Sequence, residues 1–376
     1  MKRIRDYYLS RTIEEVTKKK MQYILDEDLA TIDNLVIKNS EQGKLVCFKD
    51  PNDFEFLQKL SDNLYIEFNG FDLTDLKLEF KNSVKAIVIK ECRIDGLRIS
   101  LNNEQAGYNL VLDKVRNETG ICVDEQFPQC NKLEIIGKAT TELTREYTVQ
   151  EITENMKKII PEYLELTEDR QVALLQKKGF LSIYPQRIDI TGIDKLKLLK
   201  AISLKYMEID TINFSEITKY SKDIRPLDVI EFIDCTFNEA PVLYKQPVKR
   251  LVINHCNVKR KSLLPNFVQI NAIEVIDTKG MELPKLNEPK ILKGLKFISS
   301  EVDLTNIKNV KEIESLIILD QKLPDIQFAK KLKKLKYLVV SKGFVQDTSV
   351  IKKLKKLQFI EVEQDDLTAE YNELFV

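Results

Sequence analysis

The chain contains 376 residues but no tryptophan and only one histidine, His255. Its charges cancel, because 59 lysines and arginines stand against 59 aspartates and glutamates. A total charge of zero provides no argument for a nucleic-acid or membrane partner, so only local charge patterns can do so. A single histidine excludes a metal site built on a histidine pair, and no cysteine cluster compensates for this.

Long apolar runs are missing as well. No run approaches the length that spans a bilayer, and the first residues contain neither the apolar core nor the cleavage site of a signal peptide. We therefore expect a cytoplasmic protein that does not enter a membrane. The six cysteines include no C-x-x-C pair and are widely spread for a disulfide framework, so we expect reduced, buried thiols.

The motifs of common active sites are also missing. The chain has no G-x-G-x-x-G or G-x-x-x-x-G-K-[ST] loop to hold phosphates, and no nucleophile lies in a G-x-S-x-G context. Carboxylates are abundant, but nothing singles out a pair with opposed environments. We expect no enzyme, no cofactor and no metal.

The chain does contain a repeat, which is most regular from residue 199 to residue 367. Each unit has a central apolar residue, another three positions before it and another two positions after it. After one longer first step, the central residues recur at a nearly constant interval of about 22 residues. A fixed period of this length predicts a solenoid, in which no coil can bury its apolar edge alone. The central residues are Ile202, Ile230, Leu251, Ile273, Leu295, Leu316, Leu338 and Ile360.

The repeat also occurs earlier in the chain, at a slightly longer period, around Leu35, Leu64, Ile87, Leu110 and Leu133. Before it, apolar residues recur at roughly helical spacing, which suits a cap over the first apolar edge of a solenoid. Residues 144–187 interrupt the pattern with two helical stretches. We therefore divide the chain into a helical N-terminal cap (1–31), a first array (32–143), a helical insert or linker (144–187), a second array (188–368) and a C-terminal tail (369–376).

The strand pattern resembles leucine-rich repeats, and the C-terminal half is similar to the 22-residue repeats of internalins. The clearest match is LKYLVVSKGFVQDTSVIKKLKKL, from Leu335 to Leu357. The resemblance covers roughly two-thirds of the chain. It implies an α/β repeat solenoid, a leucine-rich-repeat horseshoe with a parallel concave sheet, here with a helical cap and a helical break in the middle. Such scaffolds bind many different partners, so the architecture does not identify one.

The resemblance also implies a role for the residue five positions after each central residue. In the family this side chain points inward and bonds backbone groups at the turn. The role suits Asn69, Cys92, Cys235, Cys256, Thr278 and Ser300. It does not suit Met207, Gln321, Gly343 and Asp365, where we expect irregular turns.

Residues one and three positions after each central residue should point outward from the concave sheet, because side chains alternate along a strand. Several of them are apolar, and adjacent coils lie about 5 Å apart, so they should form contiguous stripes. Apolar stripes beside charged rows resemble the core and rim of a protein interface. The candidate partner-binding residues are Tyr65, Val88, Val111, Ile233, Val252, Ile276, Ile298, Ile317, Leu319 and Val339.

Two alternatives account for the same outward residues. β-Branched side chains suit strands on either face, and the middle helices or the cap could fold over the sheet. Our leading hypothesis is a non-enzymatic interaction module, an adaptor or inhibitor, that binds a protein partner through the concave face. A homodimer that buries the stripes is a further alternative.

A column of lysines five positions before the central residues offers a second surface. Stacked like charges repel, so such a ridge is a candidate anion-binding site, and nucleic acid or a nucleoprotein is the alternative partner. Two glutamates interrupt the ridge and no aromatic residues are interleaved for base stacking, which favours a solvated face. The lysines are Lys290, Lys311, Lys333 and Lys355.

Overall fold

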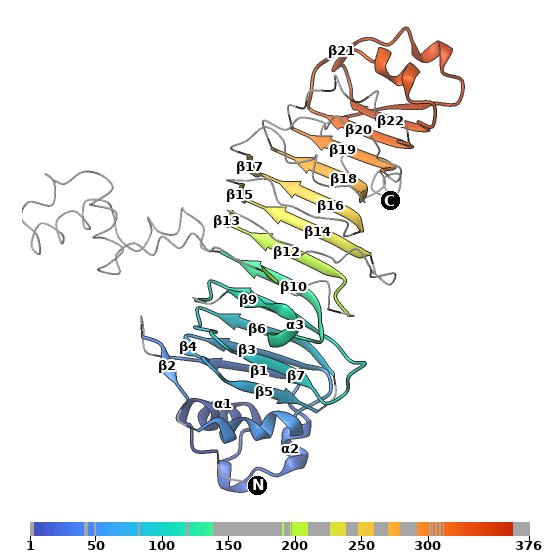
Figure 1. Ribbon diagram of the computed structural model, residues 1–376. Coiled ribbons are helices and arrows are strands. Elements are labelled where there is room, and N and C mark those ends of the chain that lie inside the picture. The colour runs from blue at the N-terminus through green and yellow to red at the C-terminus, as the bar shows by residue number, and fades with distance from the viewer. Residues whose placement is uncertain are drawn as a thin grey trace, which may run out of the picture.

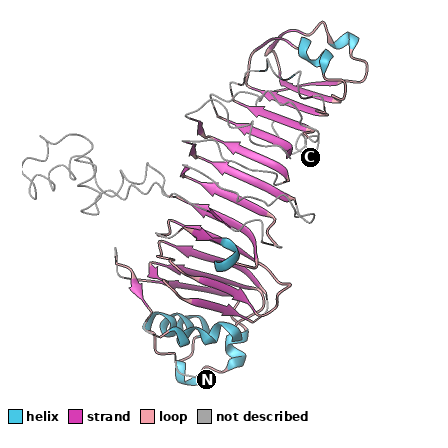
Figure 2. Ribbon diagram, viewed as in Figure 1, coloured by secondary structure: helices cyan, strands magenta, loops and turns pink. Residues whose placement is uncertain are grey.

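The structure is a computed structural model. It describes residues 4–40, 44–48, 50–81, 83–117, 120–137, 190–191, 196, 198–209, 226–237, 247–258, 270–278, 292–300, 302, 304, 307, 310 and 312–363. Within these residues one sheet has 13 parallel strands, which follow one another in chain order (Figures 1 and 2). The strands are β1 (Asn34–Lys38), β3 (Leu64–Asn69), β6 (Val84–Lys90), β8 (Tyr108–Asp113), β10 (Cys130–Ile136), β12 (Ala201–Lys205), β14 (Leu227–Ile233), β16 (Val248–Asn254), β18 (Ile270–Ile276), β19 (Gly294–Ile298), β20 (Ser315–Leu319), β22 (Tyr337–Ser341) and β24 (Gln358–Val362).

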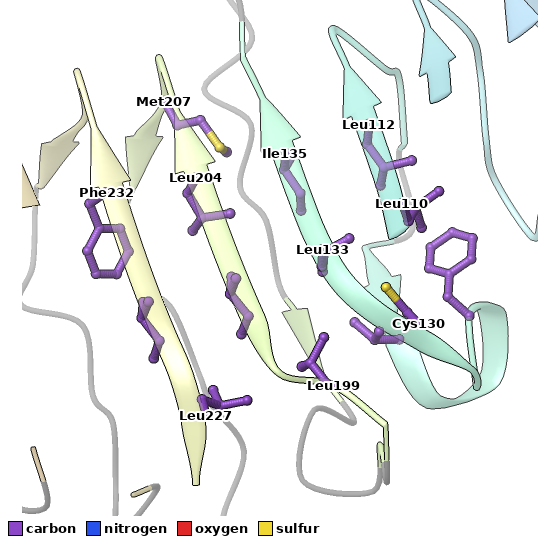
Figure 3. Close-up of a cluster of buried hydrophobic side chains, with 14 of the residues drawn as sticks. Leu110, Leu112, Cys130, Leu133, Ile135, Leu199, Leu204, Met207, Leu227 and Phe232 are labelled. Atoms are coloured by element: carbon purple, nitrogen blue, oxygen red, sulfur yellow. The ribbon is translucent and has the colours of Figure 1, made fainter. Parts of the chain in front are cut away.

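Shorter strands pair only with their equivalents in neighbouring coils. They are β2 (Val46–Cys47) with β4 (Phe71–Asp72), β5 (Lys77–Phe80) with β7 (Arg98–Leu101), β9 (Ile121–Cys122) with β11 (Ile190–Thr191), β13 (Glu208–Ile209) with β15 (Thr236–Phe237) and β17 (Asn257–Val258), and β21 (Leu323–Asp325) with β23 (Val345–Asp347). One apolar core extends through the coils behind the main sheet. Figure 3 shows its side chains on β8, β10, β12 and β14, among them Leu110, Leu133, Leu204 and Phe232. The molecule is therefore a parallel β-solenoid.

The strand register aligns one buried residue from each coil, and we call these residues the core row. From Ile230 to Phe359 its members follow one another at nearly constant intervals along the chain. Eleven of the predicted central residues belong to it, but Leu64 and Ile360 do not. The core row is Leu35, Ile66, Ile87, Leu110, Leu133, Ile202, Ile230, Leu251, Ile273, Leu295, Leu316, Leu338 and Phe359.

The main sheet continues across the interruption in the repeat. β10 pairs with β12 in parallel, and Leu133 lies opposite Ile202 although the whole interruption separates the two in sequence. The predicted helices of residues 144–187 and the predicted tail of residues 369–376 lie outside the described residues. The coils before and after the interruption therefore share one sheet and one core.

Helices lie at the N-terminal end of the stack, next to β1 (Figure 2). They are α1 (Tyr7–Thr17), the 3₁₀ turn η1 (Met21–Tyr23) and α2 (Asp26–Ala30). Asp6 begins α1 by accepting hydrogen bonds from the backbone N–H groups of Tyr8 and Leu9 at 2.9 and 3.1 Å. This satisfies donors that a helix start leaves unpaired, while Leu9 is buried in the shared core. Other helical turns are η2 (Pro51–Lys59), α3 (Val123–Gln126), η7 (Gln327–Lys331) and η8 (Ile351–Lys353).

Side chains five positions after the core row form a ladder of hydrogen bonds at the turn. Thr278 Oγ1 donates to Ile276 O at 2.9 Å and accepts from Cys256 N at 3.0 Å. Thr278 N donates in turn to Ser300 Oγ at 3.1 Å. Each rung thus joins two adjacent coils.

Cysteines take the same place earlier in the ladder. Cys92 Sγ donates to Lys90 O at 3.1 Å and accepts from Phe71 N at 3.3 Å, and Cys235 Sγ donates to Ile233 O at 3.3 Å. The role implied for Asn69 is wrong, because the register puts Asn69 three positions after Ile66 and Phe71 at the fifth position. Gln321 fits poorly, as expected, since its Nε2 donates to Val302 O at 3.0 Å instead.

Candidate interaction surface

The candidate surface is the face of the main sheet that points away from the shared core, which we call the outer face. Its first row lies one position after the core row and its second row lies three positions after it. Because strands are about 4.8 Å apart, residues of one row in adjacent coils are in contact range. The first row is Val36, Glu67, Val88, Val111, Glu134, Ser203, Glu231, Val252, Glu274, Lys296, Ile317, Val339 and Ile360. The second row is Lys38, Asn69, Lys90, Asp113, Ile136, Lys205, Ile233, Asn254, Ile276, Ile298, Leu319, Ser341 and Val362.

Three isoleucines of the second row form the part of the predicted stripe that remains partly exposed. Ile276 lies directly opposite Ile298, and Asn254 separates Ile276 from Ile233. All three isoleucines are intermediate in exposure, so their apolar tips are available to a ligand. We call Ile233, Ile276 and Ile298 the isoleucine stripe.

Three other predicted contact residues are on the same face but are not exposed. The exposed fraction is 1% for Ile317, 3% for Leu319 and 0% for Val339. With Ala272 and Val362 they form a buried apolar cluster separate from the main core. The apolar stripe expected from the sequence is therefore not exposed at these three positions, because alternation along a strand determines the face and not the exposed fraction. We call these five residues the outer cluster.

The predicted contacts near the N-terminus do not form one row. Tyr65 lies opposite Ala86, whereas Glu67 lies opposite Val88. Tyr65 Oη donates a hydrogen bond to Glu67 Oε2 at 3.1 Å, and partial burial raises the pKa of the tyrosine, with the glutamate adding to the effect. Val111 is half-buried and Val88 is buried, so this region offers little apolar area.

Sequence reasoning missed Ile136, which lies in the second row between Asp113 and Lys205 and is partly exposed. The repeat is weak in that coil, because its fifth and seventh positions are not apolar. Its position three after Leu133 would have been enough to identify it. The remaining predicted residue, Val252, is buried in the first row.

A buried carboxylate lies beside the isoleucine stripe. The side chain of Glu274 is 3% exposed and forms an ion pair with Arg250 Nε in the preceding coil. Its second oxygen lies 3.5 Å from Lys296 Nζ in the following coil. Lys205 Nζ similarly lies 2.8 Å from Glu134 Oε1. Glu134 and Glu274 are thus each paired with a cation of an adjacent coil, and partly exposed apolar side chains lie near these pairs on the outer face.

Two of the four lysines of the predicted column, Lys290 and Lys311, lie outside the described residues. Lys333 and Lys355 are exposed. Leu338 pairs with Phe359, so Lys355 is equivalent to Lys334, which lies four positions before the core row, and not to Lys333, which lies five positions before it. Lys333 and Lys355 therefore belong to different columns. Lys334 and Lys336 form ion pairs with Glu312 and Glu314 of the preceding coil. This pairing offsets the positive charge that an anionic partner would need.

His255 lies at the turn that follows β16, in a left-handed backbone conformation with φ of 53°. Its Nδ1 contacts Asp234 Oδ1 of the preceding coil, and its Nε2 lies 3.8 Å from Asp277 Oδ2 of the following coil. The hydrogen bond and charge of Asp234 raise the pKa of the imidazole above its ordinary value, and Asp277 adds to the effect. These groups form a column of turn side chains rather than a pocket.

All six cysteines are free, and Cys92, Cys130, Cys235 and Cys256 are buried. Burial raises the pKa of Cys92 to about 11 and that of Cys130 to about 12, so these thiols are protonated at neutral pH. No group of three or more His, Cys, Asp or Glu side chains in the described ranges could hold a metal ion. None of the helices described is long and apolar enough to cross a membrane.

No protein-family model matches the chain, and no curated protein matches it either. A solved structure of an internalin from Listeria monocytogenes is similar, with a TM-score of 0.48 and 14% sequence identity over 96% of this chain and 90% of that chain. This similarity is too low to support an inference about function. The similarity of the C-terminal half to 22-residue internalin repeats therefore stays a prediction.

Proposed function

We propose that this protein is a non-enzymatic interaction module, an adaptor or inhibitor, which binds a protein partner through the outer face of its main sheet. The observation that carries the proposal is the isoleucine stripe, where apolar side chains stay partly exposed on a regular, preformed surface. The same proposal assigns residues 1–31 as a cap and residues 32–143 and 188–368 as arrays of one solenoid.

The energetics favour apolar recognition on this surface. Complete burial of a branched side chain contributes about 1.5–3 kcal/mol, so each half-buried isoleucine has about 1 kcal/mol left to gain from a partner. A sheet that is already folded loses little conformational entropy on binding, so a few such contacts are sufficient for useful affinity. The charge pairs near the stripe would disfavour any partner that disrupts them without supplying opposite charges of its own.

A double substitution tests the proposal directly. Ile276→Glu/Ile298→Glu places carboxylates on partly exposed positions, so the chain should still fold while its apolar contacts are lost. We expect capture of the partner from a native lysate to fall by at least about tenfold. Quantitative mass spectrometry of captured proteins measures this, and circular dichroism confirms the fold.

The matched control is Val16→Glu, which makes a similar change at an exposed position on α1. It should leave capture unchanged. If the folded double variant captured the same proteins in the same amounts as the wild-type chain, the outer face would not be the binding surface.

One feature of the structure bears on nucleic acid, the alternative partner. Inter-coil pairing of Lys334 and Lys336 reduces support for nucleic acid, and binding to RNA or DNA at low salt would reverse that preference. A homodimer would be detected by light scattering at several concentrations. The free thiols support our proposal of a reducing, cytoplasmic location.

A further inference from the structure

A row of turn residues borders the isoleucine stripe along the ends of the strands. Each of these residues lies four positions after the core row, so it directly follows a residue of the second row. From β12 to β20 all six have a left-handed backbone conformation, with φ between 44° and 59°. We call them the turn row, which consists of Tyr206, Asp234, His255, Asp277, Ser299 and Asp320.

Side chains of the turn row meet from coil to coil, because equivalent turns share one backbone conformation. His255 contacts Asp234 through Nδ1 and lies 3.8 Å from Asp277 through Nε2. Ser299 Oγ donates a hydrogen bond to Asp320 Oδ2 at 3.0 Å. The turn row is therefore a continuous polar edge beside the partly exposed isoleucines.

This edge is acidic, and Asp277 is its most accessible carboxylate. The turn row contains three aspartates but neither lysine nor arginine. The side chain of Asp277 is 59% exposed, against 29% for Asp234. Within the described part of the chain, the one ionic contact of the Asp277 carboxylate is the imidazole of His255 at 3.8 Å. Asp277 directly follows Ile276, so its charge lies next to the middle of the isoleucine stripe.

The cations on the other side of the stripe do not balance this edge. In the first row and the turn row from β14 to β19, four carboxylates lie beside one lysine and one histidine. That lysine, Lys296, and Arg250 both contact the buried Glu274, so their charges are directed to a carboxylate of the sheet itself. Glu231, in contrast, is partly exposed. The surroundings of the stripe therefore carry an excess of negative charge.

We propose that the partner of the isoleucine stripe is a basic protein segment, whose apolar side chains cover the isoleucines while an adjacent lysine or arginine pairs with Asp277. The inference rests on the proposed function and deepens it by naming the charge of the partner. Apolar contact supplies most of the affinity, and the acidic edge selects among apolar partners because like charges brought together on binding are costly. The stripe is bounded on one side by the buried outer cluster, against which Ile298 packs, so the contact segment is centred on Ile276.

Peptides selected from a random library displayed on phage serve as the probe, because they do not presuppose the charge of the partner. The immobilised full-length chain is the bait, and the enriched peptides are synthesised with a dye. Fluorescence anisotropy then measures their affinity for the wild-type chain, for Ile276→Ser/Ile298→Ser and for Asp277→Lys. Serine replaces isoleucine in this test because a new carboxylate would itself attract a basic peptide.

We expect the enriched peptides to combine lysine or arginine with apolar residues. Ile276→Ser/Ile298→Ser should weaken their binding by about tenfold or more. Asp277→Lys should weaken it by about threefold or more, since a repulsive contact replaces an attractive one. A peptide whose basic residues are changed to glutamate should bind the wild-type chain weakly and regain affinity for Asp277→Lys. The control is Glu15→Lys, the same change of charge at an exposed position on α1, which should leave both affinities unchanged.

Failure of this inference is distinguishable from failure of the proposed function. Enriched peptides that require the isoleucines but are acidic, or that bind Asp277→Lys as tightly as the wild-type chain, would overturn the basic partner and leave the stripe as the binding surface. Peptides that bind Ile276→Ser/Ile298→Ser as tightly as the wild-type chain, or a selection that enriches no peptide, would contradict both proposals.

Discussion

Single side chains in adjacent coils pair repeatedly, because equivalent residues are only about 4.8 Å apart. Lys249 Nζ lies 2.6 Å from Asp228 Oδ1 of the preceding coil, and Lys90 Nζ lies 3.5 Å from Asp113 Oδ2 in the next coil. Such exposed pairs each contribute about 0–1 kcal/mol. Glu274 differs because it is buried, so loss of both neighbouring cations would leave a costly unpaired charge.

His255 gives a prediction at this scale, and as the only histidine it gives one unambiguous set of imidazole signals in NMR. Its pKa should lie above 6.5, and Asp234→Asn should lower it towards that value. Asp277→Asn should have a smaller effect, since Asp277 is 3.8 Å away. An unchanged pKa in Asp234→Asn would contradict the pairing.

The sign of the stability effect follows from the direction of the shift. Because the folded-state pKa is raised, the pair stabilises the fold fully below the unfolded pKa, near pH 6.5. This stabilisation is lost as the pH rises through the folded-state pKa. Asp234→Asn should therefore destabilise the protein more at pH 5.5 than at pH 8.5, which chemical unfolding at the two pH values measures.

At the scale of elements, the ladder of turn side chains links each coil to the next. Thr278→Val removes a hydroxyl but keeps the shape of the side chain, and it leaves the buried Cys256 N–H without its acceptor. We expect a loss of about 1–3 kcal/mol in the free energy of unfolding. Urea denaturation measures it, and Thr348→Val at an exposed position is the control. Equal stabilities of the two variants would show that the ladder does not hold the coils together.

The ladder also shows which structural roles the repeat pattern of the sequence can predict and which it cannot. The roles of Cys92, Cys235, Cys256, Thr278 and Ser300 could be predicted because their coils have an unambiguous core residue. In β3 the pattern was ambiguous, since Leu64, Ile66 and Phe68 are all buried. Alternation alone cannot say which of these three residues aligns with the adjacent coils, and the register aligns Ile66, rather than Leu64, with Leu35 and Ile87.

The same ambiguity affects the end of the sheet. Phe359 and Ile360 are adjacent apolar residues, and regular spacing favoured Ile360. In the structure Phe359 pairs with Leu338 and packs on the core, while Ile360 lies opposite Val339 on the outer face. The step from Leu338 to Phe359 is one position shorter than the step from Leu316 to Leu338, and this difference exchanges the two faces of β24.

At the scale of the whole molecule, two properties could not be predicted from local pattern. The pairing of β10 with β12 joins residues that a long interruption separates, and nothing near Leu133 or Ile202 in the sequence indicates it. The burial of Ile317, Leu319 and Val339 is the second property, because their offsets along the strands determine the face of the sheet and not the exposed fraction. The candidate surface is consequently smaller than the sequence predicted, and it centres on the isoleucine stripe.

The central claim is that a protein partner contacts the outer face at the isoleucine stripe. It is tested most directly by site-specific photo-crosslinking in native lysate, with a benzophenone amino acid in place of Ile276 and, separately, of Val16. We predict a discrete crosslinked product from position 276 that protease removes and nuclease does not, and no equivalent product from position 16. The same products from both positions, or a product from position 276 that nuclease removes, would contradict the claim.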